Sequence, residues 1–413
     1  MKNWVEIFLG ILTAMGGFVE VGELVFSVDA GARFGYRLLW VMALGTVGII
    51  AFCEMAGRVA AVKGQPVFNL IRERAGLNAG LVTLVAANVV NLLTCAAEIG
   101  GIALVWQLLS GWPYRWLALG ALVFLLLVLW VLSFQWIERV FGLLGLLMCT
   151  YLLAAYYLRP NWGEVAAGFI PSVPRLESSS EYLLFAYFSV AILSSVMLPY
   201  ETYFYASGAI EDGWNPGDVN LNRIISIIGS VLGSVLALAL VVCGAQVFRP
   251  NRIEPQLPGE AALAASLTLG RWGLLAAAGG MFFAFAGAAI ETSLSGAYNL
   301  AQFLGWPWGK YRPARTAARF SLTWVVTFVL AALIIMTGVD PVSVVEYSIV
   351  FSVVILPFTY FPVLVIAGDR RVMGDEHVNG WFANAVGWFF LGIVTLAALL
   401  ALPLLIATRG GQG

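Results

Sequence analysis

Eleven apolar runs separated by short polar connectors set the strongest limit on what this chain can fold into. They lie at 5–28, 37–61, 79–110, 115–134, 140–158, 182–211, 219–247, 262–290, 316–337, 341–367 and 381–407. A helix needs about 20 apolar residues to cross a bilayer, so eleven spans use most of the 413 residues. The first run is too long for a secretory signal and no small-residue cleavage site follows it. The sequence therefore predicts one all-α polytopic membrane domain, 1–413, with about 11 transmembrane helices.

The composition agrees with this class and excludes others. Hydrophobic residues make up 61% of the chain and charged residues only 11%, whereas soluble domains carry about a quarter charged residues. The net charge of -1 leaves no basic surface that could hold a nucleic acid. The chain has no phosphate-binding loop and no set of nucleophile, base and orienting residue. We therefore expect no enzyme and no cofactor, only a transported cation.

The distribution of positive charge predicts an orientation in the lipid bilayer. With the N-terminus in the cytoplasm, 13 of the 22 Lys and Arg residues fall on the cytoplasmic side. Cytoplasmic loops of membrane proteins carry such an excess. We therefore expect a multi-pass protein of the plasma membrane with a cytoplasmic N-terminus, working as a monomer.

Six glutamates lie deep inside the apolar runs, where a charge costs at least about 2.5 kcal/mol. They are Glu20, Glu23, Glu54, Glu98, Glu201 and Glu291, the last of them at the expected end of span 8. Only Glu54 has a basic residue one helical turn away, Arg58, and we interpret that pair as an ion pair at a helix end. A buried acid without such a partner holds either a proton or a cation.

Two of the apolar runs are interrupted beside these acids. The segment MGGFVEVGEL at 15–24 places three glycines around Glu20 and Glu23, and Pro199 stands two residues before Glu201 in span 6. A proline removes a helical hydrogen bond, and irregular backbone at membrane depth is tolerated only where it is buried in protein or lines a cavity. We therefore predict that both helices are broken at these points and that the three carboxylates approach one cavity.

Broken helices five spans apart are typical of transporters built from an inverted repeat, which bind their substrate between the two breaks. This pattern divides the chain into a first repeat of spans 1–5, a second repeat of spans 6–10 and an additional span 11. The corresponding ranges are 5–158, 182–367 and 381–407.

Several segments resemble the Nramp family of divalent-metal transporters. The most specific are FGYRLLW at 34–40 and GDRRVMG at 368–374. Further segments agree in the same order: LIRERAG at 70–76, AEIGG at 97–101, LPYETYFYASG at 198–208 and SLSGAYNLAQ at 293–302. The resemblance covers nearly the whole chain. It implies a LeuT-like 5+5 inverted repeat with broken helices 1 and 6, a cation site between them, and alternating access.

The resemblance also identifies the positions of the family's site, where this chain carries different residues. Where the family has Asp-Pro-Gly-Asn, this chain has Glu-Val-Gly-Glu at 20–23, and Leu-Pro-Tyr at 198–200 replaces Met-Pro-His. The implied cation-binding residues are Glu20, Gly22, Glu23, Leu198, Tyr200 and Glu201, with Glu20, Glu23 and Glu201 as metal ligands.

Proton movement, if coupled to transport, would need carboxylates. The only histidine, His377, lies in the loop between spans 10 and 11, so no imidazole lies within the membrane. Glu98 stands at the position of an acid that the family links to proton movement, and Glu291 is the second candidate for this pathway.

The residues that differ from the family's site predict that a hard cation binds here. A thioether favours soft transition metals, so Leu198 removes that preference, and added carboxylates favour Mg, Mn or Ca. Three converging glutamates carry up to three negative charges, more than one divalent ion neutralises, so one is protonated or the substrate is bulkier. The leading hypothesis is a secondary active transporter of a hard divalent cation.

Two alternatives remain open. Four aromatic residues crowd Glu201, namely Tyr200, Tyr203, Phe204 and Tyr205. Carboxylates and aromatic faces together hold amines and guanidinium, which makes a carrier of a small organic cation the first alternative. We nevertheless expect ordinary packing for at least two of these rings. The second alternative is a non-transporting sensor on the same scaffold.

Overall fold

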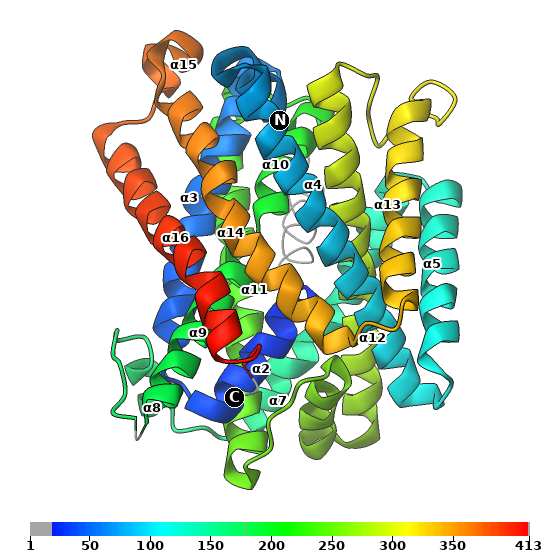
Figure 1. The fold of residues 1–413 in the computed structure, drawn as a ribbon, viewed down its shortest axis with the longest axis vertical. Helices are drawn as coiled ribbons and strands as arrows, with labels where there is room; N and C mark the ends of the chain where they lie inside the picture. Colours follow the sequence, from blue (N-terminus) through cyan, green and yellow to red (C-terminus); the bar gives the residue numbers. More distant parts are fainter. Residues whose placement is uncertain (1–18, 177, 412–413) are drawn as a thin grey trace.

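The structure is a computed structural model that describes residues 19–176 and 178–411. Within these residues it is a bundle of helices with no strand (Figure 1). The α-helices are α2 (Val21–Phe34), α3 (Leu39–Lys63), α4 (Val67–Ser110), α5 (Tyr114–Val131), α6 (Phe134–Gly145), α7 (Thr150–Tyr157), α8 (Trp162–Ala167), α9 (Ser179–Val196), α10 (Pro199–Glu211), α11 (Val219–Cys243), α12 (Pro258–Leu304), α13 (Ala318–Met336), α14 (Pro341–Gly368), α15 (Arg370–His377) and α16 (Trp381–Ala407).

Among the described residues, ten helical segments are long and apolar enough to cross a membrane. Each of them coincides with one of the predicted spans 2 to 11. The membrane-spanning part of α4 begins at Gly76, where the backbone leaves the helical conformation. Their agreement with the prediction follows from the continuous apolar runs, because a lipid-facing helix must be apolar along its whole length.

Span 1 can be compared with the prediction only in part. Residues 5–18 lie outside the described residues, and α2 forms the remainder of the span. This helix ends at Phe34, whereas the prediction ended the span at residue 28. It stops there because Gly35 adopts φ 64°, a left-handed conformation that favours glycine, while its N–H is bonded to the carbonyl of Gly31.

The predicted end of span 8 at residue 290 is wrong. Helix α12 continues to Leu304, where Gly305 with φ 70° terminates it. The segment after residue 290 is polar, so its hydropathy falls, but neighbouring helices bury its side chains. Those fully buried include Thr292, Ser293, Ser295 and Asn299. Glu291 therefore lies inside α12 and not at the end of a span.

The predicted break in span 6 is confirmed. Helix α9 ends at Val196, Leu198 is extended with φ -72° and ψ 125°, and α10 starts at Pro199. Proline suits the first helical position because its missing N–H has no intrahelical partner there. In span 1, Val19 and Glu20 are non-helical and α2 starts at Val21; the residues before them lie outside the described part.

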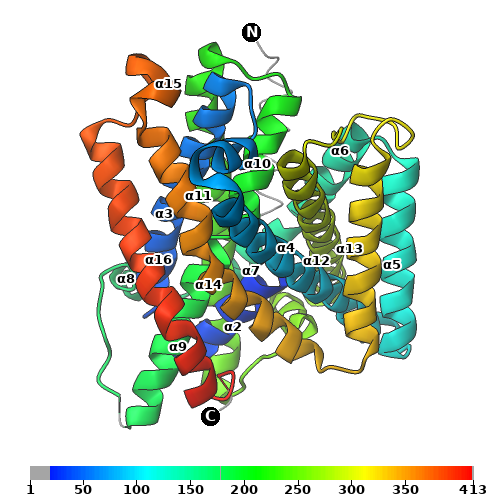
Figure 2. The same cartoon turned by 45° about the horizontal axis from the view of Figure 1, so that its top comes forward.

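The two half-helices that follow the breaks run in opposite directions. In both views α2 lies at the end of the bundle near the C-terminus, while α10 lies toward the end that carries α15 (Figures 1 and 2). Helices α4 and α12 pack against each other beside these breaks, and α14 packs against α4 on the other side. The starts of α2 and α10 therefore lie inside the bundle, away from both of its ends.

Candidate cation site

Glu20 and Glu23 are buried at the start of α2. Glu20 precedes the first helical residue and Glu23 lies in the first turn. Their exposed fractions are only 2% and 1%, and the Oε2 atom of each has no hydrogen-bond partner among the described residues. The unpaired N–H groups of a helix start stabilise negative charge. The start of α2 therefore presents two carboxylates with free coordination capacity.

Glu98 of α4 is tied directly to the break in span 1. Its Oε1 atom accepts a hydrogen bond of 2.9 Å from the backbone N–H of Val21, the first residue of α2. The side chain is fully buried, and its Oε2 atom has no partner within the described part of the chain. Glu98 thus satisfies one N–H that a helix start leaves unpaired and lies next to Glu20.

Gly22 allows α14 to approach the start of α2. A Cβ atom at Gly22 would lie 2.5 Å from Cδ1 of Ile349 and 3.2 Å from Oε1 of Glu20. A larger residue would therefore displace either α14 or the Glu20 carboxylate. Ile349 is apolar, so at this position α14 offers packing and no ligand.

The start of α10 carries Tyr200 and Glu201, both buried. The Oε2 atom of Glu201 has no partner among the residues described. Its charge interacts with those of Glu20 and Glu23 across the two breaks and with that of Glu291 in α12. The structure thus brings together, within electrostatic range, the three predicted ligands and the two candidate proton-pathway acids, Glu98 and Glu291.

No finished metal site is present in the part of the chain that the structure describes. No three side chains among its Asp, Glu, His and Cys residues converge closely enough to hold a metal ion. The three predicted ligands approach one region but do not surround one point. A magnesium ion keeps much of its water and is often held by only one or two carboxylates, and this arrangement can accept such an ion.

Leu198 is fully buried at the break, and no thioether takes its place. The preceding residue, Met197, directs its sulfur against α3, since a Cβ at Gly48 would lie 2.8 Å from Met197 Sδ. The soft ligand that the family carries at this position is therefore absent from the described site.

Three of the four aromatic residues around Glu201 serve the packing of the bundle. Tyr203 donates a hydrogen bond to the carbonyl of Thr359, and Tyr205 donates one of 2.9 Å to Oδ1 of Asn222. Phe204 packs on the ring of Tyr298, with the centroids 6.0 Å apart. This arrangement agrees with the expectation of ordinary packing and leaves only Tyr200 as a candidate aromatic contact for a substrate.

The predicted ion pair between Glu54 and Arg58 is present. Arg58 Nε lies 2.9 Å from Glu54 Oε1, and Nη2 lies 3.1 Å from Oε2. The sequence did not indicate two further members: Asn379, whose Oδ1 accepts from Arg58 at 2.6 Å, and Arg223, 3.4 Å from Glu54. This network joins α3, α11 and the segment before α16, so it belongs to the scaffold.

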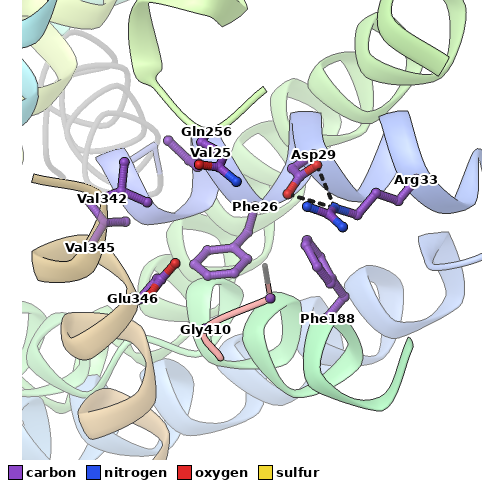
Figure 3. Close-up of a pocket in the computed structure, with 11 residues that line it drawn as sticks. Val25, Phe26, Asp29, Arg33, Phe188, Gln256, Val342, Val345, Glu346 and Gly410 are labelled. Carbon is purple, nitrogen blue, oxygen red and sulfur yellow. Dashed lines mark hydrogen bonds and ion pairs between the residues drawn. The ribbon is translucent and has the colours of Figure 1, made fainter. Parts of the chain in front are cut away.

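A small pocket lies beside residues 25–33 of α2, between α9, the start of α14 and residues 410–411 (Figure 3). It has room for one or two water molecules. Arg33 lines one side of it, with Nε 2.9 Å from Asp29 Oδ1 and Nη2 2.8 Å from Glu254 Oε2. These ion pairs hold the last turn of α2 against the segment before α12.

The sequence contained a signal for one of these two ion pairs. Asp29 and Arg33 are four residues apart on one helix, the spacing of an ion pair, but the predicted span ended at residue 28 and left both in a loop. Glu254 lies 221 positions further along the chain than Arg33, and no local pattern connects the two.

A model of the Nramp family, described as natural resistance-associated macrophage protein-like, matches residues 10–403. A divalent metal cation transporter MntH of Deinococcus radiodurans is 27% identical over 407 residues, which cover 94% of this chain and 87% of that protein. A protein of the same name from Ralstonia nicotianae is 27% identical over 412 residues, covering 94% and 88%.

Solved transporter structures have the same fold. A manganese transporter of Eremococcus coleocola, in complex with an aromatic bis-isothiourea substituted compound, matches with a TM-score of 0.79 and 18% identity, covering 100% of this chain and 93% of that one. MhsT in complex with L-phenylalanine matches with a TM-score of 0.66 and 15% identity, covering 98% and 99%.

These likenesses agree with the helical bundle, and they confirm the predicted LeuT-like fold. The predicted Nramp resemblance is also confirmed, because the family match extends over nearly the whole chain. The chain is a multi-pass membrane protein and a transporter, not an enzyme. It belongs to the Nramp family.

Proposed function

We propose that this protein carries a hard divalent cation of the Mg, Mn or Ca class by alternating access, and that the cation binds between the starts of α2 and α10. One observation carries the proposal. Glu20 and Glu23 on one side and Glu201 on the other are buried, and each has an oxygen without a partner among the described residues. Such charges are expensive in a membrane interior unless a cation or a proton accompanies them.

The donor set supports a hard cation over a soft one. Carboxylate oxygens suit Mg, Ca and Mn, whereas Cd and other soft metals prefer sulfur. Leu198 supplies no sulfur, and Met197 directs its thioether toward α3. The relatives from Deinococcus radiodurans and Ralstonia nicotianae are named as divalent metal cation transporters, which supports the same charge class for this chain.

The absence of three converging ligands among the described residues favours a partly hydrated ion. We propose that Glu20 or Glu23 contacts the cation directly and that Glu201 contacts it through water or after a small movement of α10. A magnesium ion dehydrates reluctantly and suits this mode. A soft ion that needs several direct protein ligands does not suit it.

We propose that Glu98 couples transport to a proton. One of its oxygens is fixed to the N–H of Val21, and the other is free of partners among the described residues. The charge of Glu20 interacts with that of Glu98. A cation that binds at Glu20 makes the negative form of Glu98 more favourable and drives off a proton that Glu98 holds. Glu291 of α12, whose charge interacts with that of Glu201, is the second acid of this proposed pathway.

The predicted topology assigns each end of the bundle to one side of the membrane. With a cytoplasmic N-terminus in the plasma membrane, the end of α2 with Arg33 faces outward and the end of α10 faces the cytoplasm. We propose that Arg33 and its partners form part of the closure on the outer side.

A thermal-shift screen of the purified protein tests the proposal. A ligand in about 100-fold excess over its dissociation constant stabilises the native state by about 2.7 kcal/mol. We expect Mg²⁺, Mn²⁺ or Ca²⁺ to raise the apparent melting temperature and Cd²⁺ to do so weakly. The increase is expected to vanish in Glu20→Gln and Glu23→Gln.

The matched control is Glu73→Gln, the same change at an exposed residue of α4, which is expected to respond as the wild type does. Stabilisation by guanidinium or methylammonium without any response to divalent metals would replace the proposal with the organic-cation alternative. An equal metal response in Glu20→Gln, Glu23→Gln and the wild type would remove these carboxylates from the site.

A further inference from the structure

The contact between α10 and α12 is polar along two helical turns. Close to the break, Ser295 donates a hydrogen bond of 3.3 Å to the carbonyl of Tyr200. Seven residues further along both helices, Gln302 Nε2 donates one of 2.8 Å to Ser207 Oγ. We call this contact, from Tyr200 and Ser295 to Ser207 and Gln302, the polar seam. It runs from the candidate cation site toward the end of α10.

Asn299 lies on α12 between the two hydrogen bonds of the polar seam. It follows Glu291 by eight residues and Ser295 by four, so the three side chains share one face of the helix. At 1.5 Å per residue, Asn299 is roughly 6 Å beyond Ser295 along the axis. The next residue after Ser295, Gly296, faces α4, since its Cβ would lie 2.8 Å from Asn88 Oδ1. Asn299 therefore lies where α10, α12 and α4 meet.

The side chain of Asn299 is fully buried. Neither Oδ1 nor Nδ2 has a hydrogen-bond partner among the residues that the structure describes. Burying an amide without hydrogen bonds destabilises a protein, and a leucine, whose side chain has the same number of heavy atoms and branches at the same carbon, would avoid this penalty. A ligand that is present for part of the time would satisfy this amide.

An asparagine oxygen is a good ligand for a hard cation. Divalent ions such as calcium bind amide and backbone carbonyl oxygens as well as carboxylates. A neutral amide binds a divalent ion more weakly than a carboxylate does, so it can hold the ion briefly without trapping it. The charge of Glu291 interacts with that of Glu201, so the acidic region of the site extends toward the start of the face that carries Asn299.

We propose that Asn299 is a transit ligand, which binds the cation between the site at Glu201 and the far end of the polar seam. The proposal rests on the function proposed above. It predicts that Asn299 contributes to the rate of transport and not to the affinity of the resting site. It also predicts that removing the amide stabilises the protein, because an unpaired buried polar group is lost.

Three substitutions test the proposal: Asn299→Leu, Asn299→Ala and Asn299→Ser. For each we would measure the apparent melting temperature, its increase with Mn²⁺, and the initial rate of Mn²⁺ uptake into proteoliposomes. We expect Asn299→Leu to melt higher than the wild type, to keep the full response to Mn²⁺, and to transport about tenfold more slowly, as the loss of one such interaction implies. Asn299→Ala is expected to be equally slow, and Asn299→Ser to keep an intermediate rate.

The matched control is Asn222→Leu. Asn222 is also a fully buried asparagine, but its Nδ2 donates to the carbonyl of Glu54 at 2.8 Å and its Oδ1 accepts from Tyr205. The same substitution there is expected to lower the melting temperature, because it removes both of these side-chain hydrogen bonds.

Each other outcome overturns the transit role. A lower melting temperature for Asn299→Leu shows a structural partner, and a lost Mn²⁺ response places Asn299 in the resting site. A slow Asn299→Leu beside a fast Asn299→Ala shows a steric block, and wild-type rates in both show that the amide has no role. Failure of the proposed function is separate from these results, because it would appear as a wild-type protein without any Mn²⁺ uptake.

Discussion

Alanine in place of Gly31 is expected to push α2 away from α11 and to weaken both folding and cation binding. A Cβ atom at Gly31 would lie 2.2 Å from the carbonyl oxygen of Val241 and 2.9 Å from the backbone N of Ala245. The contact is reciprocal, since a Cβ at Gly244 would lie 2.0 Å from the carbonyl oxygen of Val28. Backbone atoms cannot rotate away, so the two helices must separate by about 1 Å to restore normal contact.

The magnitude follows from this geometry. Overpacking of a filled core costs about 1–3 kcal/mol, and a gap of up to about 1 Å forfeits a quarter to a half of the dispersion energy of the atoms along it. Alanine recovers up to about 1 kcal/mol through its higher helix propensity. We therefore expect Gly31→Ala to lower the free energy of unfolding by about 2 kcal/mol. Gly120→Ala is the control, because a Cβ there meets nothing within 4 Å.

A double-mutant cycle measures the shared contact. Once Gly31→Ala has separated the helices, the Cβ of Gly244→Ala finds room, so the double variant should lose less stability than the sum of the single losses. Apparent melting temperatures and denaturant titrations in detergent give these values. Because α2 carries Glu20 and Glu23, the thermal response to Mn²⁺ should also fall. A Gly31→Ala protein that melts like Gly120→Ala, or strictly additive losses, would refute the close packing of α2 on α11.

Three further predictions concern the ion pairs and the soft ligand. Glu54→Gln is expected to lower the free energy of unfolding by about 1–3 kcal/mol, because it leaves the buried Arg58 incompletely paired; an unchanged melting temperature would contradict it. Leu198→Met is expected to increase stabilisation by Cd²⁺ if the site admits a dehydrated ion, whereas an unchanged Cd²⁺ response would show that water stays between the metal and position 198. Arg33→Gln is expected to open the pocket beside α2, so that a membrane-impermeant thiol reagent labels Val345→Cys faster than it does with Arg33 intact. Equal labelling rates would show that Arg33 does not close this route.

The spans were predictable because lipid imposes an apolar surface on every helix that faces it. The break in span 6 was predictable because Pro199 interrupts an apolar run beside Glu201. In span 1 only the start of α2 at Val21 can be compared with the prediction, because the residues before Val19 lie outside the described part. The end of α12 was not predictable from hydropathy, since its last turns are polar and buried by other helices. For that reason Glu291 was placed at the end of a span and not inside one.

The site was predictable only where its residues carry charge in an apolar segment. Glu20, Glu23, Glu98 and Glu201 stood out for this reason, and the structure places them around the two breaks. Asn299 was not found, because a neutral amide in a polar stretch gives no such signal. The distances among the carboxylates could not be predicted either, because they depend on how α2, α4 and α10 pack.

Uptake of Mn²⁺ by proteoliposomes, measured with competing cations, tests whether this protein carries a hard divalent cation. We expect the wild type to take up Mn²⁺, excess Mg²⁺ or Ca²⁺ to inhibit this uptake, guanidinium to leave it unchanged, and Glu23→Gln to abolish it. We also expect weak competition by Cd²⁺, because Leu198 supplies no sulfur. A strong preference for Cd²⁺ would contradict the role given to Leu198. Currents carried by guanidinium without any metal uptake would contradict the assignment of a divalent cation.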